Sequence, residues 1–120
     1  MGPPMNIYNA WFDLKPGVSD VDFTDRLAAY LGSLQADGLM AGWRLMRRKL
    51  GLSAADVGEF HLMMEFETLD QLDGAFSRVG SRREPIEGLH FGVNALVQNV
   101  KFALYRDFPD TIRHRGEEKF

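Results

Sequence analysis

Five side chains that could do chemistry are predicted to gather on one face of a β-sheet. Successive residues of a strand point to opposite faces, and we assign the more apolar set of each predicted strand to the other face, beneath the helices. His61 is the candidate catalytic base, because it alone has an ordinary pKa near neutrality, and Glu65 on the same face could orient it. Trp11 and Tyr105 would form flat apolar walls, and Asn9 would donate a hydrogen bond to a carbonyl. Aromatic walls with a few polar groups are typical of a small-molecule site.

The same five residues also fit a purely structural interpretation. Two sheets that pack face to face bury Trp, Met and Tyr side chains, and satisfy an occasional His or Asn with hydrogen bonds. A slip of one residue in register would send every one of these side chains to the opposite face. The sequence therefore leaves a functional pocket and a filled interface as alternatives.

The spacing of histidines and carboxylates predicts no metal site. The chain has no cysteine and no HxH or HExxH pattern, and His61 with Glu65 supplies too few ligands for a closed zinc site. His90 and Asn94 lie four residues apart on a predicted short helix and therefore share a face. His90 is accordingly a sixth candidate ligand-binding residue.

Hydrophobic periodicity and turn residues predict the elements that position these side chains. Residue types, alternation and flanking turns predict strands over 5–14, 59–67 and 100–108. The segment 39–50 fits a strand or a helix by periodicity, and its place between a helix stop and the turn at Gly51 predicts a strand. Helical periodicity predicts a first helix from Ser19 or Asp20 to Gly38, and a second helix in two pieces, capped by Thr68 and resumed at Pro85. The order β-α-β-β-α-β predicts a ferredoxin-like α+β sandwich: a four-stranded antiparallel sheet with helices on one face.

The predicted domain occupies residues 1–109 and is followed by a charged C-terminal tail over 110–120. Its helix-free sheet face would carry large apolar groups such as Trp11, Met63 and Tyr105, which are costly to leave in water. Two such faces packed together would bury these groups and form a twofold dimer with a barrel-like interior. We therefore expect a homodimer through the open sheet face.

Three segments resemble strands of the dimeric α+β barrel superfamily: YNAWFDLKPG at 8–17, FHLMMEFE at 60–67 and VKFALYRDFP at 100–109. This superfamily includes stress-responsive barrel proteins, antibiotic-biosynthesis monooxygenase-like proteins and haem-degrading monooxygenases, and the likeness is strongest to small, uncharacterised bacterial members. Haem-degrading relatives use a His together with an Asn and a Trp, types that His90, Asn9 and Trp11 supply. The Trp here lies on the first strand and the third strand has none, so no haem or other cofactor is expected.

Composition limits the classes of function. A chain of 120 residues with a net charge of −3 is unlike the basic modules that bind nucleic acid. No apolar run approaches the roughly 20 residues of a membrane span, and no secretory signal is visible, so we expect a cytoplasmic protein. Within these limits we expect a small organic ligand in a cavity on the open sheet face. The alternatives are a cofactor-independent monooxygenase or isomerase-like enzyme, and a structural or stress-related protein without a ligand.

Overall fold

Four strands and three helices follow one another in the order of a ferredoxin-like fold. The computed structural model describes residues 4–52 and 56–109. Its elements are β1 (Asn6–Leu14), α1 (Asp20–Ala36), β2 (Gly42–Arg47), β3 (Phe60–Phe66), α2 (Leu69–Gly80), α3 (Ile86–Asn94) and β4 (Val97–Arg106). The strands form one sheet in the order β2-β3-β1-β4, and every neighbouring pair is antiparallel. The predicted fold class is confirmed, and the predicted tail over 110–120 lies outside the described residues.

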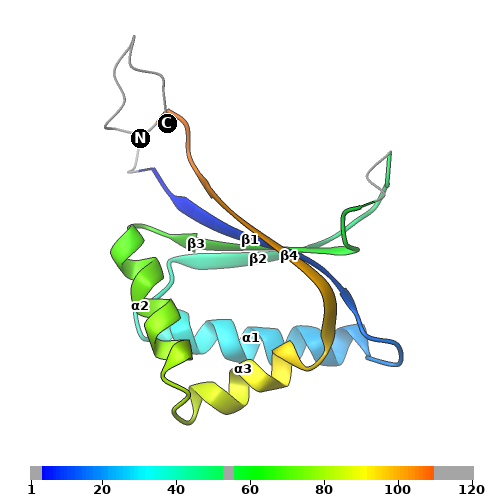
Figure 1. The fold of residues 1–120 in the computed structure, drawn as a ribbon, viewed down its shortest axis with the longest axis horizontal. Coiled ribbons are helices and arrows are strands. Elements are labelled where there is room, and N and C mark those ends of the chain that lie inside the picture. The colour runs from blue at the N-terminus through cyan, green and yellow to red at the C-terminus, as the bar shows by residue number, and fades with distance from the viewer. Residues whose placement is uncertain (1–3, 53–55, 110–120) are drawn as a thin grey trace.

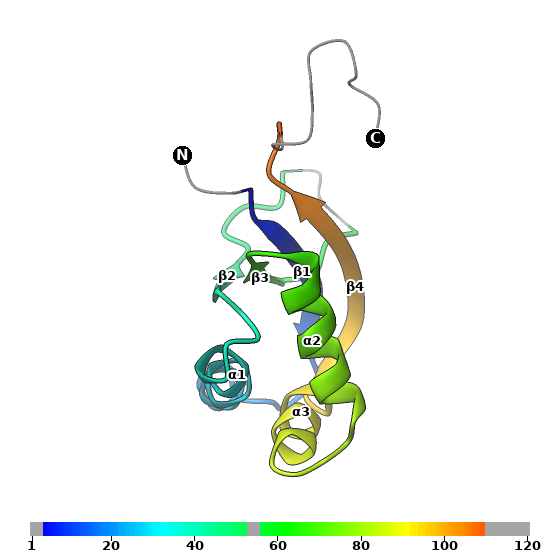
Figure 2. The ribbon, with the colours of Figure 1, turned by 90° about the vertical axis from the view of Figure 1, so that its left-hand side faces the viewer.

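The three helices lie on one side of the sheet, which leaves its other face without helices (Figure 1). Strand β4 curves strongly on its way from the end of α3 into the sheet (Figure 2). Aromatic rings join the two layers: Phe12 of β1 lies 5.4 Å from Phe23 of α1 and 5.8 Å from Phe60 of β3, measured between ring centroids. All three rings are buried, and each contributes about 1.5–3 kcal/mol of hydrophobic stabilisation.

Polar caps begin the first two helices where the sequence predicts them. The Ser19 hydroxyl accepts a hydrogen bond from the Asp22 amide at 3.3 Å, and the Thr68 hydroxyl accepts one from the Gln71 amide at 3.0 Å. Each bond satisfies an amide that has no partner within its helix. Gly38 follows α1 with a φ of +75°, a left-handed conformation that glycine adopts without steric cost.

Strand β4 begins at Val97, three residues before its predicted start at 100. Val97 pairs with Leu14, and the register between β1 and β4 then shifts. Asn99 has a φ of +56° in this irregular stretch, and its side chain donates a hydrogen bond to Asp13 at 3.2 Å. A bulge of this kind bends the strand locally, which agrees with the curvature of β4. Because a bulge interrupts the alternation of side chains, a period-two pattern misses the first three residues of β4.

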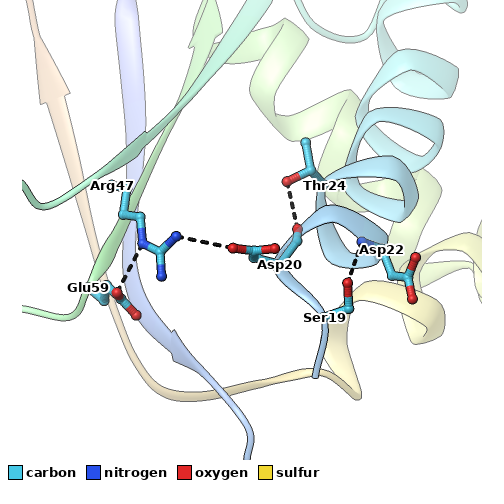
Figure 3. A network of polar contacts seen from close by, with 6 residues as sticks. All are labelled: Ser19, Asp20, Asp22, Thr24, Arg47 and Glu59. Carbon is cyan, nitrogen blue, oxygen red and sulfur yellow. Dashed lines mark hydrogen bonds and ion pairs between the residues drawn. The ribbon is translucent and has the colours of Figure 1, made fainter. Parts of the chain in front are cut away.

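An ion-pair network fastens the start of α1 to the sheet (Figure 3). Arg47, the last residue of β2, donates to Asp20 from Nη1 at 3.1 Å and to Glu59 from Nε at 3.0 Å. The guanidinium carbon also lies 5.2 Å from the centroid of the Phe60 ring. All three charged side chains are well exposed, so solvent screening keeps the contribution of each pair to stability small.

Candidate functional site

The helix-free face of the sheet carries the five side chains first considered as a site. Residues paired across antiparallel strands point to the same face. The register pairs Trp11 with His61, and Ile7 with both Glu65 and Tyr105. Asn9 and Trp11 therefore share this face with His61, Glu65 and Tyr105. We call it the open face.

Three of these side chains form one tight cluster. The His61 ring stacks on the Trp11 indole, with centroids 4.6 Å apart and planes inclined by 14°. His61 Nε2 lies 2.8 Å from Asn9 Oδ1. Asn9 Nδ2 donates to the carbonyls of Ile7 at 3.1 Å and Ala103 at 3.3 Å. Asn9 is only 5% exposed, so its amide is fixed within the sheet.

The fixed amide determines where His61 carries its proton. Both Asn9 Nδ2 hydrogens are directed to backbone carbonyls, so Oδ1 is the group that faces the imidazole. A carbonyl oxygen can only accept, and Nε2 must therefore be the protonated nitrogen. Burial lowers the pKa of His61, so at neutral pH the ring is uncharged and Nδ1 carries a lone pair.

Glu65 does not orient His61, contrary to the expectation from their shared face. Four residues of extended strand separate them, a distance of about 13 Å. Glu65 instead pairs with Gly42 and Ile7, and its carboxylate lies above Gly42, where an added Cβ would meet Oε2 at 3.9 Å. The partner of His61 is Asn9, which comes from the neighbouring strand and could be found only from the register.

A cavity of about 380 Å³ lies on the opposite side of the sheet, between β1, β3 and β4 and the three helices. Its lining is largely apolar and includes Ala10, Leu27, Leu62, Ala75, Val93 and Phe102. Two lining residues, Phe76 of α2 and Phe102 of β4, are 49% and 58% exposed, so the cavity opens to the surface beside β4. We call it the helix-side cavity. The predicted pocket residues Asn9, Trp11, His61, Glu65 and Tyr105 lie outside its lining, and only His90 of the predicted set belongs to it.

A few polar groups interrupt the apolar wall of the helix-side cavity. They are Tyr8 of β1, Tyr30 of α1, and His90 and Asn94 of α3. The Tyr30 and His90 rings lie 5.4 Å apart between centroids at an angle of 53°. Burial raises the pKa of Tyr30 to about 12, so its phenol stays neutral and can donate a hydrogen bond at any physiological pH.

Sequence reasoning missed the two tyrosines of this cavity. Tyr30 falls in the apolar stripe of its helix, and Tyr8 lies on the same face of β1 as the core residues Ala10 and Phe12, so both resemble ordinary packing residues. The useful signal is that each carries a hydroxyl into a predicted core, where polar groups need a partner. The spacing of His90 and Asn94 did indicate a shared face of α3, and both line the cavity.

Within residues 4–52 and 56–109 no group of three or more His, Asp or Glu side chains could hold a metal ion. Among the residues that the structure describes, the lining of the helix-side cavity likewise contains no Lys, Arg, Asp or Glu. A ligand there would meet neutral hydrogen-bonding groups and aromatic rings. Among the described helices, none has the length and apolar character to cross a membrane.

The fold and its helix-side cavity define an α+β protein of the ferredoxin-like class, and comparison with known proteins gives the family. The model of the Family of unknown function (DUF6614) matches residues 5–120, and the chain belongs to this family. A search of curated proteins found no match.

Solved structures with the same fold come from distant proteins. SnoaB of Streptomyces nogalater, described as a cofactor-independent oxygenase, is 10% identical; the match covers 93% of this chain and 100% of SnoaB with a TM-score of 0.64. A dimeric ferredoxin-like protein of unknown function from Thermobifida fusca is 13% identical, with coverage of 86% and 91% and a TM-score of 0.56. Hydroxynitrile lyase from Passiflora edulis is 15% identical, with coverage of 89% and 96% and a TM-score of 0.61. Such low identities establish the fold alone.

Proposed function

We propose that this protein is a homodimer that binds a small, largely apolar organic molecule in the helix-side cavity. The observation that carries the proposal is the cavity itself, about 380 Å³ of space between sheet and helices. Pockets that bind small organic molecules have volumes of about 300 Å³ or more, and they combine apolar walls with a few polar groups. No described residue of the lining is charged, which favours a neutral ligand, because a charge would lose its hydration without gaining a partner.

The arrangement of the wall suggests how such a ligand would be held. Tyr8 stacks on Phe102, with centroids 5.4 Å apart, and meets the edge of Phe76 at 5.2 Å. These rings would pack against an aromatic ligand at the open end of the cavity. Tyr30 and His90 would provide hydrogen bonds to a hydroxyl or carbonyl group on the ligand.

The binding proposal can be tested with the neutral fluorescent probe N-phenyl-1-naphthylamine. We expect saturable, one-site binding to the wild-type protein and a loss of affinity of about tenfold or more in Ala75→Phe, whose new ring would occupy the cavity. Ala28→Phe is the matched control, because Ala28 lies on the exposed side of α1 and does not line the cavity. Its affinity should equal that of the wild type.

Two further measurements make that test decisive. Circular dichroism and thermal unfolding establish whether Ala75→Phe still folds, and Val79→Phe fills the same cavity from another position of α2. Absence of saturable binding to the wild type would contradict the proposal and favour a structural or stress-related protein without a ligand. Equal affinity in the wild type and both filled variants would show that the probe binds elsewhere.

A second candidate function is an enzyme that abstracts a proton without a cofactor. The observation that favours it is His90, an imidazole in an apolar wall beside the neutral phenol of Tyr30. A base in such a place could remove an acidic C–H proton, while the phenol stabilises the resulting enolate oxygen. SnoaB shares the fold and is described as a cofactor-independent oxygenase.

Deuterium exchange into 2-tetralone, a cyclic aromatic ketone, would detect this activity. Proton transfer from the α-carbon to His90 and return of a deuteron from the solvent leave the ketone otherwise unchanged. We expect exchange above the buffer rate to disappear in His90→Gln and to persist in His61→Gln. The reverse pattern would assign the chemistry to the open face, and exchange at the buffer rate alone would contradict the enzymatic candidate.

The homodimer is proposed to form through the open face. Trp11, Met46 and Met63 lie on this face and remain partly exposed in a single copy. A second copy would remove them from water, as expected for an interface rich in Trp and Met. The protein from Thermobifida fusca that shares the fold is described as dimeric.

A further inference from the structure

We propose that His61 presents Nδ1 to the second copy as a hydrogen-bond acceptor, so that acidification separates the two copies. The inference rests on the proposed dimer and adds to it a specific recognition atom and a mode of regulation. Its basis is the cluster of Asn9, Trp11 and His61, which fixes both the tautomer and the orientation of one imidazole on the open face.

The lone pair of the His61 ring has a fixed position, on Nδ1. Asn9 Oδ1 lies 2.8 Å from Nε2 and holds the ring proton there. The ring also stacks on Trp11, and turning it about Cβ–Cγ would replace Nε2 by a carbon and lose the contact with Asn9, so the two contacts together hold one orientation. Nδ1 has no hydrogen-bond partner anywhere in the part of the chain that the structure describes. An acceptor held in one orientation at an interface needs a donor from the other side.

The neighbours of His61 on the open face would not stabilise a positive charge on its ring. Met46 lies directly across from His61 on β2, and Trp11 lies across from it on β1. Two cationic residues share this face: Arg44, two residues along β2 from Met46, and Lys101, which pairs with Trp11 on β4 and donates to the Asp56 carbonyl at 2.8 Å. A positive charge on His61 would therefore have apolar side chains as its direct cross-strand neighbours, with two cationic residues on the same face.

The carboxylates nearest to His61 along the chain and across the sheet are engaged by other groups. Glu59 is engaged by Arg47 at 3.0 Å, and Asp13 accepts hydrogen bonds from the Glu59 amide at 2.9 Å and from Asn99 at 3.2 Å. Glu65, on the same strand as His61, lies about 13 Å along it. No carboxylate within residues 4–52 and 56–109 forms a hydrogen bond or an ion pair with His61.

Protonation of His61 would therefore weaken the proposed dimer. Protonation converts Nδ1 from an acceptor into a donor and places an unpaired charge in the interface. Burial already lowers the pKa of His61 in a single copy, and contact with a second copy would bury it further. The dimer therefore binds fewer protons than two separate copies, and its dissociation constant must rise as the pH falls below the pKa of His61 in the single copy. A twofold dimer contains two such histidines, so the response is steep.

Sedimentation equilibrium at several pH values tests this inference. For the wild type we expect the dissociation constant to rise about tenfold or more between about pH 7.5 and about pH 5.5. In His61→Phe, which keeps an aromatic ring on Trp11 but cannot be protonated, the change should be less than about threefold over the same range. His61→Gln is a second non-titrating variant in case the first fails to fold. His90→Gln removes a histidine from the other side of the sheet and should respond like the wild type.

Each outcome bears on one proposal. A wild-type protein that is monomeric near pH 8 at micromolar concentration would contradict the proposed dimer, and with it this inference. A dimer that is equally strong at both pH values would leave the dimer standing and overturn the role of His61. Acid dissociation of equal size in the wild type and in both His61 variants would also overturn it, because the titrating group would then be another one.

Discussion

The imidazole of His61 and the indole of Trp11 are stacked cross-strand neighbours on the open face, with ring centroids 4.6 Å apart. With Asn9, these two rings form a compact cluster on the open face in which the imidazole is held in one orientation. The helix-side cavity occupies the opposite face of the same sheet, whereas the sequence predicted a ligand cavity on the open face. The predictions below address each of them.

Introducing a charge at Trp11 should break the proposed dimer. Trp11→Glu would place a carboxylate in the centre of the interface, and an unpaired buried charge is strongly unfavourable. We expect monomers or aggregates in size-exclusion chromatography with light scattering. Val21→Glu, at an exposed position of α1, is the control and should elute like the wild type. A Trp11→Glu protein that remains a dimer of normal stability would place the interface elsewhere.

Two glycine-to-alanine changes should have opposite effects on the free energy of unfolding. A Cβ at Gly58 would lie 2.6 Å from the backbone nitrogen of Phe12, so the backbone at one of the two residues must move. We expect Gly58→Ala to lower the free energy of unfolding by about 2–4 kcal/mol. Gly32 lies inside α1 with nothing within 4 Å of an added Cβ, and Gly32→Ala should gain about 0.5–1 kcal/mol. Urea denaturation measures both. A neutral Gly58→Ala would contradict the close approach of the two backbones.

Replacing Asn9 by Asp should raise the pKa of His61 relative to the wild type. The carboxylate would face Nε2 at hydrogen-bonding distance and favour the imidazolium. It would also lose the donor that Asn9 directs to the carbonyls of Ile7 and Ala103, at a cost of about 1–3 kcal/mol. An NMR titration of the His61 ring protons measures the pKa, and Asn9→Ala is the matched control without the new charge. An unchanged or lower pKa in Asn9→Asp would refute the contact.

Asp13 should make part of the stability sensitive to acid. Its pKa is lowered, first by the hydrogen bond from the Glu59 amide and then by the one from Asn99. A carboxyl whose pKa is lower in the folded state stabilises the fold above its unfolded pKa of about 3.8, and loses that contribution as the pH falls through the folded value. We expect the free energy of unfolding to fall more steeply on acidification in the wild type than in Asp13→Asn. Parallel curves would mean that Asp13 has no such role.

Much of the fold could be predicted because it depends on local patterns. Ser19 and Thr68 mark the starts of α1 and α2 through their own hydrogen bonds to nearby amides. The alternation in β1 and β3 assigns side chains to faces without knowledge of their partners. The bulge at Asn99 depends on a cross-strand contact with Asp13, which no local pattern reports.

The site was harder to predict because it depends on distances between elements. His61 and Glu65 share a face, yet the partner of His61 is Asn9, and only the register of β1 against β3 reveals this. The helix-side cavity depends on how far three helices stand from the sheet, so Tyr30 resembles an ordinary core residue in the sequence. Apolar periodicity predicts which side of a helix is covered, but not whether the covering layer leaves space.

The most direct test of the central claim is to locate a bound neutral probe by NMR. With N-phenyl-1-naphthylamine added to the labelled protein, we expect chemical-shift changes and probe contacts at the methyl groups of Ala75 and Leu62 and at the ring of His90, which all line the helix-side cavity. The methyl groups of Ala103 and Met63, on the open face, should change little. Contacts confined to Ala103 and Met63, with Ala75 and His90 unaffected, would contradict ligand binding in the helix-side cavity.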